Sequence, residues 1–416
     1  MISYQKYTLK NGLRLLVHRD ETTTVAAVNI LYNAGARDED PSRTGFAHLF
    51  EHLMFGGSVH IPDFDGPLQQ AGGENNAFTT NDLTNYYLTI PQNNLETALW
   101  LESDRMLNLA FTEKSLDVQR QVVVEEFRQR YLNQPYGDLW LLLRPLAYQV
   151  HPYRWATIGM DISHIQQATM EEVHRFYETF YHPGNAIISV VSGLEEDHIA
   201  RLVEKWFGDI PGKDYHVRAL PKEPVQTEAR TLTVNKPVPF DVITIAYPMA
   251  ARRDPDYYAH DLISDLLSSG KSSRMYEDLI RNKRTFTDIS AYITGDDDPG
   301  LFIIYGKLSP DTSKEVAEAQ IMAHLDGLSN EVPETREFQK AIHRIESVRA
   351  FSDVTSLNRA YKLAWAEWMG DLSLVNDEMD HYHRLNPEKI SEAAKRLFRP
   401  ENASTLYYLS SEKPNV

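Results

Sequence analysis

The stretch Phe180-Tyr-His-Pro-Gly-Asn-Ala-Ile-Ile188 returns near the end of the chain as Leu397-Phe-Arg-Pro-Glu-Asn-Ala-Ser-Thr405. Each copy follows a helical pattern and precedes a β-rich one. A second pair of similar segments, 30–57 and 243–270, has almost the same separation, and each member is a strand-like run followed by a helical one. Two matches at one separation indicate a duplicated unit, although strand–loop–helix patterns are common in α/β proteins in general.

The duplication predicts two homologous domains. The polar segment 211–224 contains three prolines and a glycine, which is typical of a linker. We therefore predict an N-terminal domain at 1–210, a linker at 211–228 and a C-terminal domain at 229–416.

Each predicted domain mixes strands and helices. Strands are expected at 12–18, 24–34, 83–90, 186–193, 240–248, 286–294, 300–307 and 404–409. Helices are expected at 43–56, 113–132, 166–181, 256–269, 313–328 and 333–350. The hairpin-like pair 286–294 and 300–307 favours partly antiparallel sheets. The predicted fold class is therefore α+β, with two homologous halves that are each a mostly antiparallel sheet with helices packed on it.

The composition excludes several classes of protein. The chain has 416 residues and no cysteine, which rules out a disulfide framework, a thiolate metal site and a cysteine nucleophile. The formal net charge of −17 argues against nucleic-acid binding and would favour cationic partners. Neither a membrane-spanning segment nor a secretory signal is visible, so a cytoplasmic protein without membrane attachment is expected.

The segment 45–57 carries the chemistry. Its apolar residues recur at helical spacing and define one face of a helix: Phe46, Leu49, Phe50, Leu53 and Met54. His48, Glu51 and His52 fall on the opposite face. Histidines at i and i+4 can hold one zinc ion, and Glu51 can take a proton from the attacking water. The plainer alternative is that all three are ordinary polar residues of a helix.

A third ligand is needed, because a catalytic zinc site usually has three protein ligands and one open position. Without cysteine it must be His, Asp or Glu, and the best candidates lie in the segment 119–130. If this segment is helical, Glu126 borders the inward stripe that contains Val123 and Phe127, whereas Glu125 points toward solvent. Glu126 is therefore preferred over Glu125. A structural zinc is disfavoured because no fourth ligand suggests itself.

The motif His48-Leu-Phe-Glu51-His52 resembles the inverted zinc motif of the pitrilysin and insulysin metallopeptidases, the inverzincins, a family that includes the mitochondrial processing peptidase. Further segments that resemble the family are 34–38, 55–58, 72–80, 84–87, 133–137 and 151–153, so the likeness covers nearly the whole chain. It implies that His48, His52 and Glu126 bind one zinc ion per chain and that Glu51 is the general base.

The resemblance also implies that only the first half binds metal. Aligning Leu53 with Leu266 sets three other residues opposite the motif, namely Asp261, Ser264 and Asp265. The C-terminal domain would then have no metal site and would form a wall against which substrate binds.

Substrate binding is a further implication of the resemblance. It makes four residues part of an edge strand that pairs with an extended peptide: Asn76, Ala77, Phe78 and Thr79. The alternative is an ordinary sheet strand after a glycine-rich turn.

The second half departs from the family pattern at one position. Arg281 matches the arginine that binds peptide in active single-chain members, but the tyrosine expected seven residues later is Asp288, with Tyr292 nearby. An ionised carboxylate cannot donate a hydrogen bond to an oxyanion. We therefore expect a heterodimer with a homologous chain that supplies Arg and Tyr, as in the two-subunit bacterial branch, or else a homodimer.

The predicted function is that of a zinc-dependent endopeptidase, which hydrolyses unfolded peptides inside a clamshell chamber with Glu51 as general base. The alternative is a non-catalytic or partner-dependent assembly subunit of a processing-peptidase-like heterodimer, although a scaffold would have no use for the general base. A zinc hydrolase of small amides is less favoured, because nothing in the sequence suggests a small closed pocket.

Overall fold

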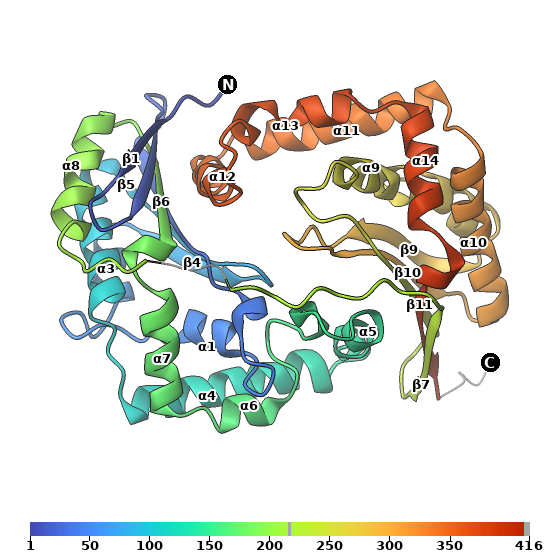
Figure 1. The fold of residues 1–416 in the computed structure, drawn as a ribbon, viewed down its shortest axis with the longest axis horizontal. Coiled ribbons are helices and arrows are strands. Elements are labelled where there is room, and N and C mark those ends of the chain that lie inside the picture. The colour runs from blue at the N-terminus through green and yellow to red at the C-terminus, as the bar shows by residue number, and fades with distance from the viewer. Residues whose placement is uncertain (215–217, 412–416) are drawn as a thin grey trace. The chain divides into compact units, whose positions relative to one another are not determined.

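The computed structural model describes residues 1–214 and 218–411, which fold into two compact units (Figure 1). The first unit comprises Met1–Phe127, Trp155–Leu220 and Arg349–Glu378, and the second comprises Arg128–Arg154, Pro221–Val348 and Met379–Val416. No helix in the described part of the chain is both long and apolar enough to cross a membrane.

The first unit is built on a six-stranded sheet. Its strands, in spatial order, are β1 (Gln5–Thr8), β2 (Arg14–Arg19), β6 (Ala186–Ser192), β3 (Val25–Tyr32), β5 (Thr84–Pro91) and β4 (Glu74–Thr79). Neighbouring strands are antiparallel except β2 and β6, which are parallel. Every residue of β6 is buried, as expected of a central strand with both faces covered.

The second unit repeats this arrangement with five strands. Their spatial order is β7 (Arg230–Lys236), β11 (Ser404–Ser410), β8 (Val242–Pro248), β10 (Leu301–Leu308) and β9 (Phe286–Ile293). The single parallel pair is again at the same place, between β7 and β11. With β1 set aside, the two sheets have the same connectivity. The predicted fold class, two homologous and mostly antiparallel α+β halves, is confirmed.

Helices cover both sheets. Those of the first unit are α1 (Phe46–Leu53), α2 (Asp65–Gln70), α3 (Leu95–Leu107), α4 (Glu113–Phe127), α6 (Ile162–Gln166), α7 (Met170–Phe180), α8 (Glu196–Phe207) and α12 (Ser356–Trp368). Those wholly or mainly in the second unit are α5 (Leu139–Ala147), α9 (Tyr257–Ser268), α10 (Lys314–Asn330), α11 (Thr335–Ser352) and α14 (Pro387–Leu397), while α13 (Leu374–His383) crosses from the first unit to the second. Short 3₁₀ turns lie at η1 (Ala36–Asp38), η2 (Gln92–Asn94), η4 (Pro152–Arg154), η5 (Pro183–Asn185) and η7 (Pro400–Asn402), and π-helical turns at η3 (Arg128–Leu132) and η6 (Tyr276–Asn282).

The two halves of the sequence exchange one helix each. Helix α12 comes from the C-terminal half but packs on β3 and β6, where Ser189 Oγ donates a hydrogen bond of 2.6 Å to the carbonyl of Ala360. Helix α5 comes from the N-terminal half but packs on β7, β8 and β11, where Arg230 donates to the carbonyl of Ala147 at 2.8 Å.

This exchange makes the compact units differ from the predicted domains 1–210 and 229–416. The chain does pass from one unit to the other within the predicted linker 211–228, at Leu220. The segments 128–154 and 349–378, however, each belong to the unit of the other half. Sequence composition marks exposed connections, whereas the apolar face of each sheet is buried by whichever helix reaches it.

Candidate metal centre

Helix α1 has the two faces that its sequence predicts. Leu49 and Phe50 are fully buried in the first unit, and Phe46 and Leu53 nearly so. The side chains of His48, Glu51 and His52 are 13%, 16% and 24% exposed on the other face. These three polar groups therefore look out from the core and are only partly open to water.

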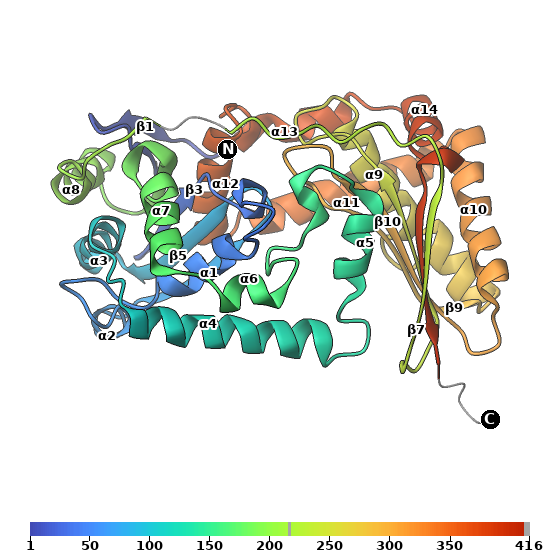
Figure 2. The ribbon, with the colours of Figure 1, turned by 60° about the horizontal axis from the view of Figure 1, so that its bottom comes forward.

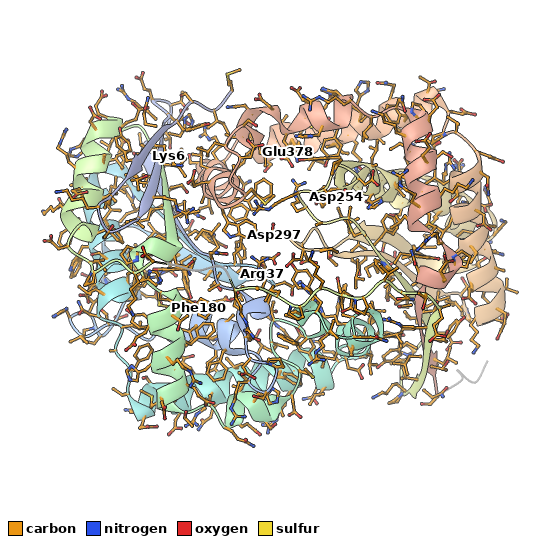
Figure 3. The ribbon with its side chains drawn as sticks, viewed as in Figure 1. Lys6, Arg37, Phe180, Asp254, Asp297 and Glu378 are labelled. Atoms are coloured by element: carbon orange, nitrogen blue, oxygen red, sulfur yellow. The ribbon has the colours of Figure 1, made fainter. Side chains whose placement is uncertain are left out.

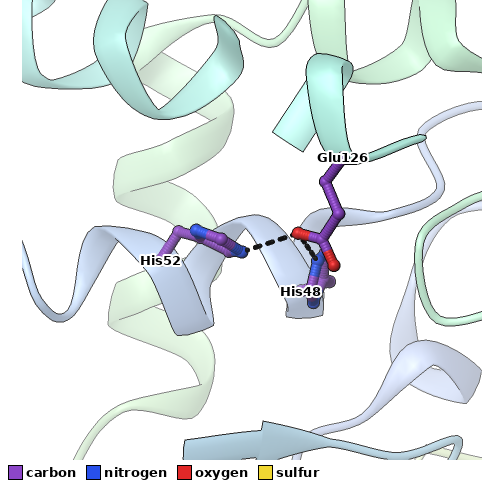
Figure 4. A group of neighbouring side chains, drawn as sticks. All are labelled: His48, His52 and Glu126. Carbon is purple, nitrogen blue, oxygen red and sulfur yellow. Dashed lines mark hydrogen bonds and ion pairs between the residues drawn. The ribbon is translucent and has the colours of Figure 1, made fainter. Parts of the chain in front are cut away.

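Helix α4 brings the third predicted residue to this face. It contacts both α1 and α6 (Figure 2). Glu126 Oε2 lies 3.2 Å from His48 Nε2 and 3.3 Å from His52 Nε2 (Figure 4). The neighbouring Glu125 is exposed, as the helical periodicity predicts.

The donor set fits a zinc ion. One ligand atom from each of His48, His52 and Glu126 lies within 4.8 Å of the other two, and within the described residues this is the single such group of three or more. Tetrahedral ligands about 2.0–2.2 Å from a zinc ion are separated by about 3.3–3.6 Å, close to both distances from the Glu126 oxygen. Two imidazoles with one carboxylate are also the ligands of known catalytic zinc sites that keep a position open.

The electrostatics of the site favour a cation. Burial lowers the pKa of His48, but hydrogen bonds to Glu126 and Glu51 outweigh it and raise that pKa to about 9. Burial raises the pKa of Glu51, yet hydrogen bonds with His48 and Thr79 lower it below its usual value. The two carboxylates thus stabilise positive charge at this face of α1, and the same attraction would hold a divalent cation there.

Strand β4 joins the site through Thr79, whose hydroxyl donates a hydrogen bond of 2.6 Å to Glu51 Oε2. Because β4 is at the edge of its sheet and pairs with β5 alone, its other side is unpaired within the sheet. Asn76 Oδ1 accepts a hydrogen bond of 2.8 Å from the Ala77 N–H. The N–H of Thr80 bonds to Leu83, and only alternate residues of an antiparallel strand bond to the partner strand, so the N–H of Ala77 faces away from β5. Sequence reasoning placed Asn76, Ala77, Phe78 and Thr79 on this edge strand but missed the contact with Glu51.

The other predicted substrate residue, Arg281, lies in the second unit. It is in the π-helical turn η6, with a side chain 70% exposed and Nη1 3.6 Å from Glu277 Oε1. Asp288 and Tyr292 lie on β9, paired with Lys307 and Ile303. The role of Arg281 stays a prediction.

The positions that correspond to the motif in α9 have partners within the second unit. Asp261 Oδ2 accepts a hydrogen bond of 2.5 Å from the Tyr382 hydroxyl. Ser264 Oγ donates to the carbonyl of Asp261 at 2.7 Å. Asp265 Oδ1 lies 3.7 Å from Arg344 Nε.

A buried carboxylate next to α1 was also missed by sequence reasoning. Glu39 is 2% exposed and accepts hydrogen bonds from the N–H groups of Gly45 and Ala47. A signal existed: α1 begins at a glycine, which has no side chain to cap it, and an acidic residue precedes that glycine by six positions.

Comparison with known proteins identifies the family of the chain. Residues 14–151 match the model of the insulinase family (peptidase family M16), and residues 167–345 match a model described as the peptidase M16 inactive domain. The zinc protease PqqE of Helicobacter pylori is 30% identical, over 97% of this chain and 92% of that protein. The uncharacterized zinc protease YmxG of Bacillus subtilis is 23% identical, over 99% of this chain and 100% of that protein.

The fold is shared as well. The crystal structure of a protease from Helicobacter pylori superposes with a TM-score of 0.92 at 29% identity, covering 98% of this chain and 100% of that one. An M16-like structure from Alicyclobacillus acidocaldarius superposes with a TM-score of 0.85 at 18% identity, covering 99% of each chain. The resemblance inferred from the inverted motif is thereby confirmed: the chain belongs to the insulinase family, peptidase family M16.

Proposed function

We propose that this protein is a zinc-dependent endopeptidase whose active site is the face of α1 that carries His48, Glu51 and His52. The observation that carries the proposal is the convergence of both imidazoles on the carboxylate of Glu126, with Glu51 beside them. His48, His52 and Glu126 would hold the ion, one per chain. Zinc bound there would supply a Lewis acid that polarises the scissile carbonyl. It would also lower the pKa of water, which then gives up a proton more readily and attacks that carbonyl.

Glu51 is the general base in this proposal. Its carboxylate takes the proton from the attacking water and delivers it to the nitrogen of the leaving amine. The hydrogen bond from Thr79 occupies Oε2 and fixes the carboxylate in one orientation, which leaves Oε1 for the proton.

The substrate would bind along the unpaired side of β4. An extended peptide adds a strand to a sheet edge through main-chain hydrogen bonds, which demand little of its sequence. The N–H of Ala77 is a suitable donor, since it faces away from β5 and donates to the side chain of Asn76. Unfolded peptides are therefore the substrates we propose, and the predicted enclosure in a chamber stays a prediction.

The second half is proposed to bind substrate without metal. Its match to a model called the inactive domain supports this division. Arg281 remains a candidate contact for the peptide. The candidate partner is a homologous chain that supplies Arg and Tyr, or else a second copy of this chain. The alternative function, a non-catalytic assembly subunit, is less favoured because all four residues of the proposed zinc site are intact.

The test combines metal analysis with turnover of an unstructured peptide by the wild type and by Glu51→Gln. We expect one zinc ion per chain in both and a loss of turnover of about 10²–10⁴-fold in the variant, because proton transfer is what Glu51 contributes. Equal turnover would show that Glu51 is not the base. A wild type that binds zinc but is active only after addition of a homologous chain would favour the partner-dependent alternative.

A further inference from the structure

Glu39 is a buried acid that touches the metal-binding helix. It follows η1 and is 2% exposed. Its Oε2 accepts the N–H of Gly45 and its Oε1 accepts the N–H of Ala47, each at 2.8 Å. Both donors belong to the start of α1, and His48 is the next residue along the helix. One carboxylate thus spans the first turn from outside.

Helix α1 cannot be capped in the usual way. Its N-cap residue is Gly45, with a φ of +90°, and no side chain there accepts a hydrogen bond from the helix. A Cβ at this position would lie 2.7 Å from the carbonyl oxygen of Ile158 and 2.8 Å from Cδ1 of Ile165, so glycine is required. The first N–H groups of any helix lack partners within it, and a cap supplies them. Glu39 does so here in place of residue 45.

The backbone around Glu39 is itself held. Trp155 Nε1 donates to the carbonyl of Ala36 at 2.9 Å. Arg218 Nη1 donates to the carbonyls of Asp38 and Glu39 at 3.0 and 3.1 Å. In the same turn Arg37, labelled in Figure 3, forms an ion pair of 3.0 Å with Asp82. The carboxylate therefore has a fixed position from which to hold the helix.

A buried acid of this kind is costly. Burial raises the pKa of Glu39 to about 8, against the opposing effect of the two N–H groups. An isolated buried carboxylate would destabilise the fold unless its hydrogen bonds were satisfied. Both of its oxygens accept hydrogen bonds from the start of α1, so these bonds stabilise the helix that carries the candidate metal ligands.

We propose that Glu39 is a positioning residue that fixes the first turn of α1 and with it the imidazole of His48 relative to Glu126. The inference rests on the proposed zinc site and adds a residue outside the zinc-binding motif. Groups that orient metal ligands typically alter metal affinity about 10–100-fold when they are replaced. When Glu39 is ionised, both of its oxygens accept a backbone N–H. In Glu39→Gln an amide nitrogen replaces one acceptor and faces a backbone N–H, so the turn loses a hydrogen bond and the ligands lose their alignment.

The test measures zinc affinity of the full-length, metal-free protein by competition with a chelator, at a pH above 8 so that Glu39 is ionised. Glu39→Gln is expected to bind zinc about 10–100-fold more weakly than the wild type. Amide hydrogen exchange at Gly45 and Ala47 in the metal-free protein should also be faster in the variant. The matched control is Glu378→Gln: Glu378, labelled in Figure 3, is 4% exposed and pairs with Arg349. It should lower the Tm without changing zinc affinity or the exchange of these two amides.

A second variant covers the case in which Glu39→Gln does not fold. Trp155→Phe keeps the carboxylate but removes the hydrogen bond to Ala36 and the N–H that also favours the ionised form of Glu39. It should therefore weaken zinc binding in the same direction by a smaller factor. Zinc affinity equal to that of the control in the folded variants would overturn the role of Glu39. Failure of the wild type itself to bind zinc would instead overturn the proposed function.

Discussion

Helices α1 and α9 occupy the same place in two sheets of the same connectivity but differ in what they hold. In the first unit His52 Nε2 lies 3.3 Å from Glu126 of α4. In the second unit Asp265 of α9 lies 3.7 Å from Arg344 of α11. The acid is therefore on the helix that corresponds to α1, and its partner on the neighbouring helix is a cation. The second unit pairs its acid with a cation of the chain, whereas the first offers donors that suit an external cation. The repeated scaffold therefore does not determine the chemistry, which a few side chains decide.

The largest expected effect comes from removing the carboxylate that the second unit lacks. Glu126→Gln should weaken zinc binding by more than about 100-fold, because even residues that only orient a ligand change affinity about 10–100-fold. Competition with a chelator measures this. The matched control is Glu125→Gln on the exposed side of α4, which should stay within about twofold of the wild type. A larger loss of zinc affinity in Glu125→Gln than in Glu126→Gln would show that Glu125 is the ligand.

Acid should act on α9 through a histidine that has no counterpart in α1. Burial lowers the pKa of His260 to about 4, and its Nδ1 accepts the Ala250 N–H at 3.3 Å. An unfolded chain takes up the proton near pH 6.5, so the stability from this group is complete above pH 6.5 and is lost as the pH falls toward 4. The loss in free energy of unfolding is up to about 3 kcal/mol.

Denaturant unfolding of the wild type and of His260→Gln between pH 7 and pH 4 measures this difference. The glutamine can still accept the N–H of Ala250 and does not titrate, so its free energy of unfolding should fall less steeply with acid. Parallel curves would show that His260 does not contribute.

The edge of β4 can be tested without disturbing the metal. Ala77→Pro removes an N–H that does not bond to β5, so the sheet should survive while a bound peptide loses one main-chain hydrogen bond. We expect KM to rise about tenfold, with unchanged zinc content. Asn76→Ala leaves that N–H in place and serves as the control, with KM unchanged or lower. A Pro variant with the KM of the wild type would exclude pairing at this residue.

The smallest effect is expected at Thr79. Thr79→Val keeps the shape but removes the hydrogen bond to Glu51, so kcat should fall about fivefold while KM and zinc content are retained. Thr79→Ser keeps the hydroxyl and should restore kcat. If both variants had the same kcat, the hydroxyl would not act on Glu51.

Much of the fold could be predicted because its patterns are local. Apolar, β-rich runs gave all eight expected strands, and the helical periodicity distinguished the partly buried Glu126 from the exposed Glu125. The polar strands β1 and β7 were not predicted, since their exposed residues carry little apolar signal. The helices α5 and α12 are also absent from the predicted helices, and their exchange could not be predicted because an amphipathic helix does not specify which sheet it will cover.

The sequence by itself determined that two imidazoles and a carboxylate share one face of a helix, since their spacing matches the helical repeat. It also determined the duplication of the fold and the later helix that carries Glu126. Only the tertiary structure decided that Thr79 reaches Glu51 and that Glu39 caps α1, because these contacts depend on where a strand edge and a loop come to rest against the helix. Such contacts join residues from different elements, which no helical or strand repeat relates to one another. They are set by the way these elements pack in the first unit.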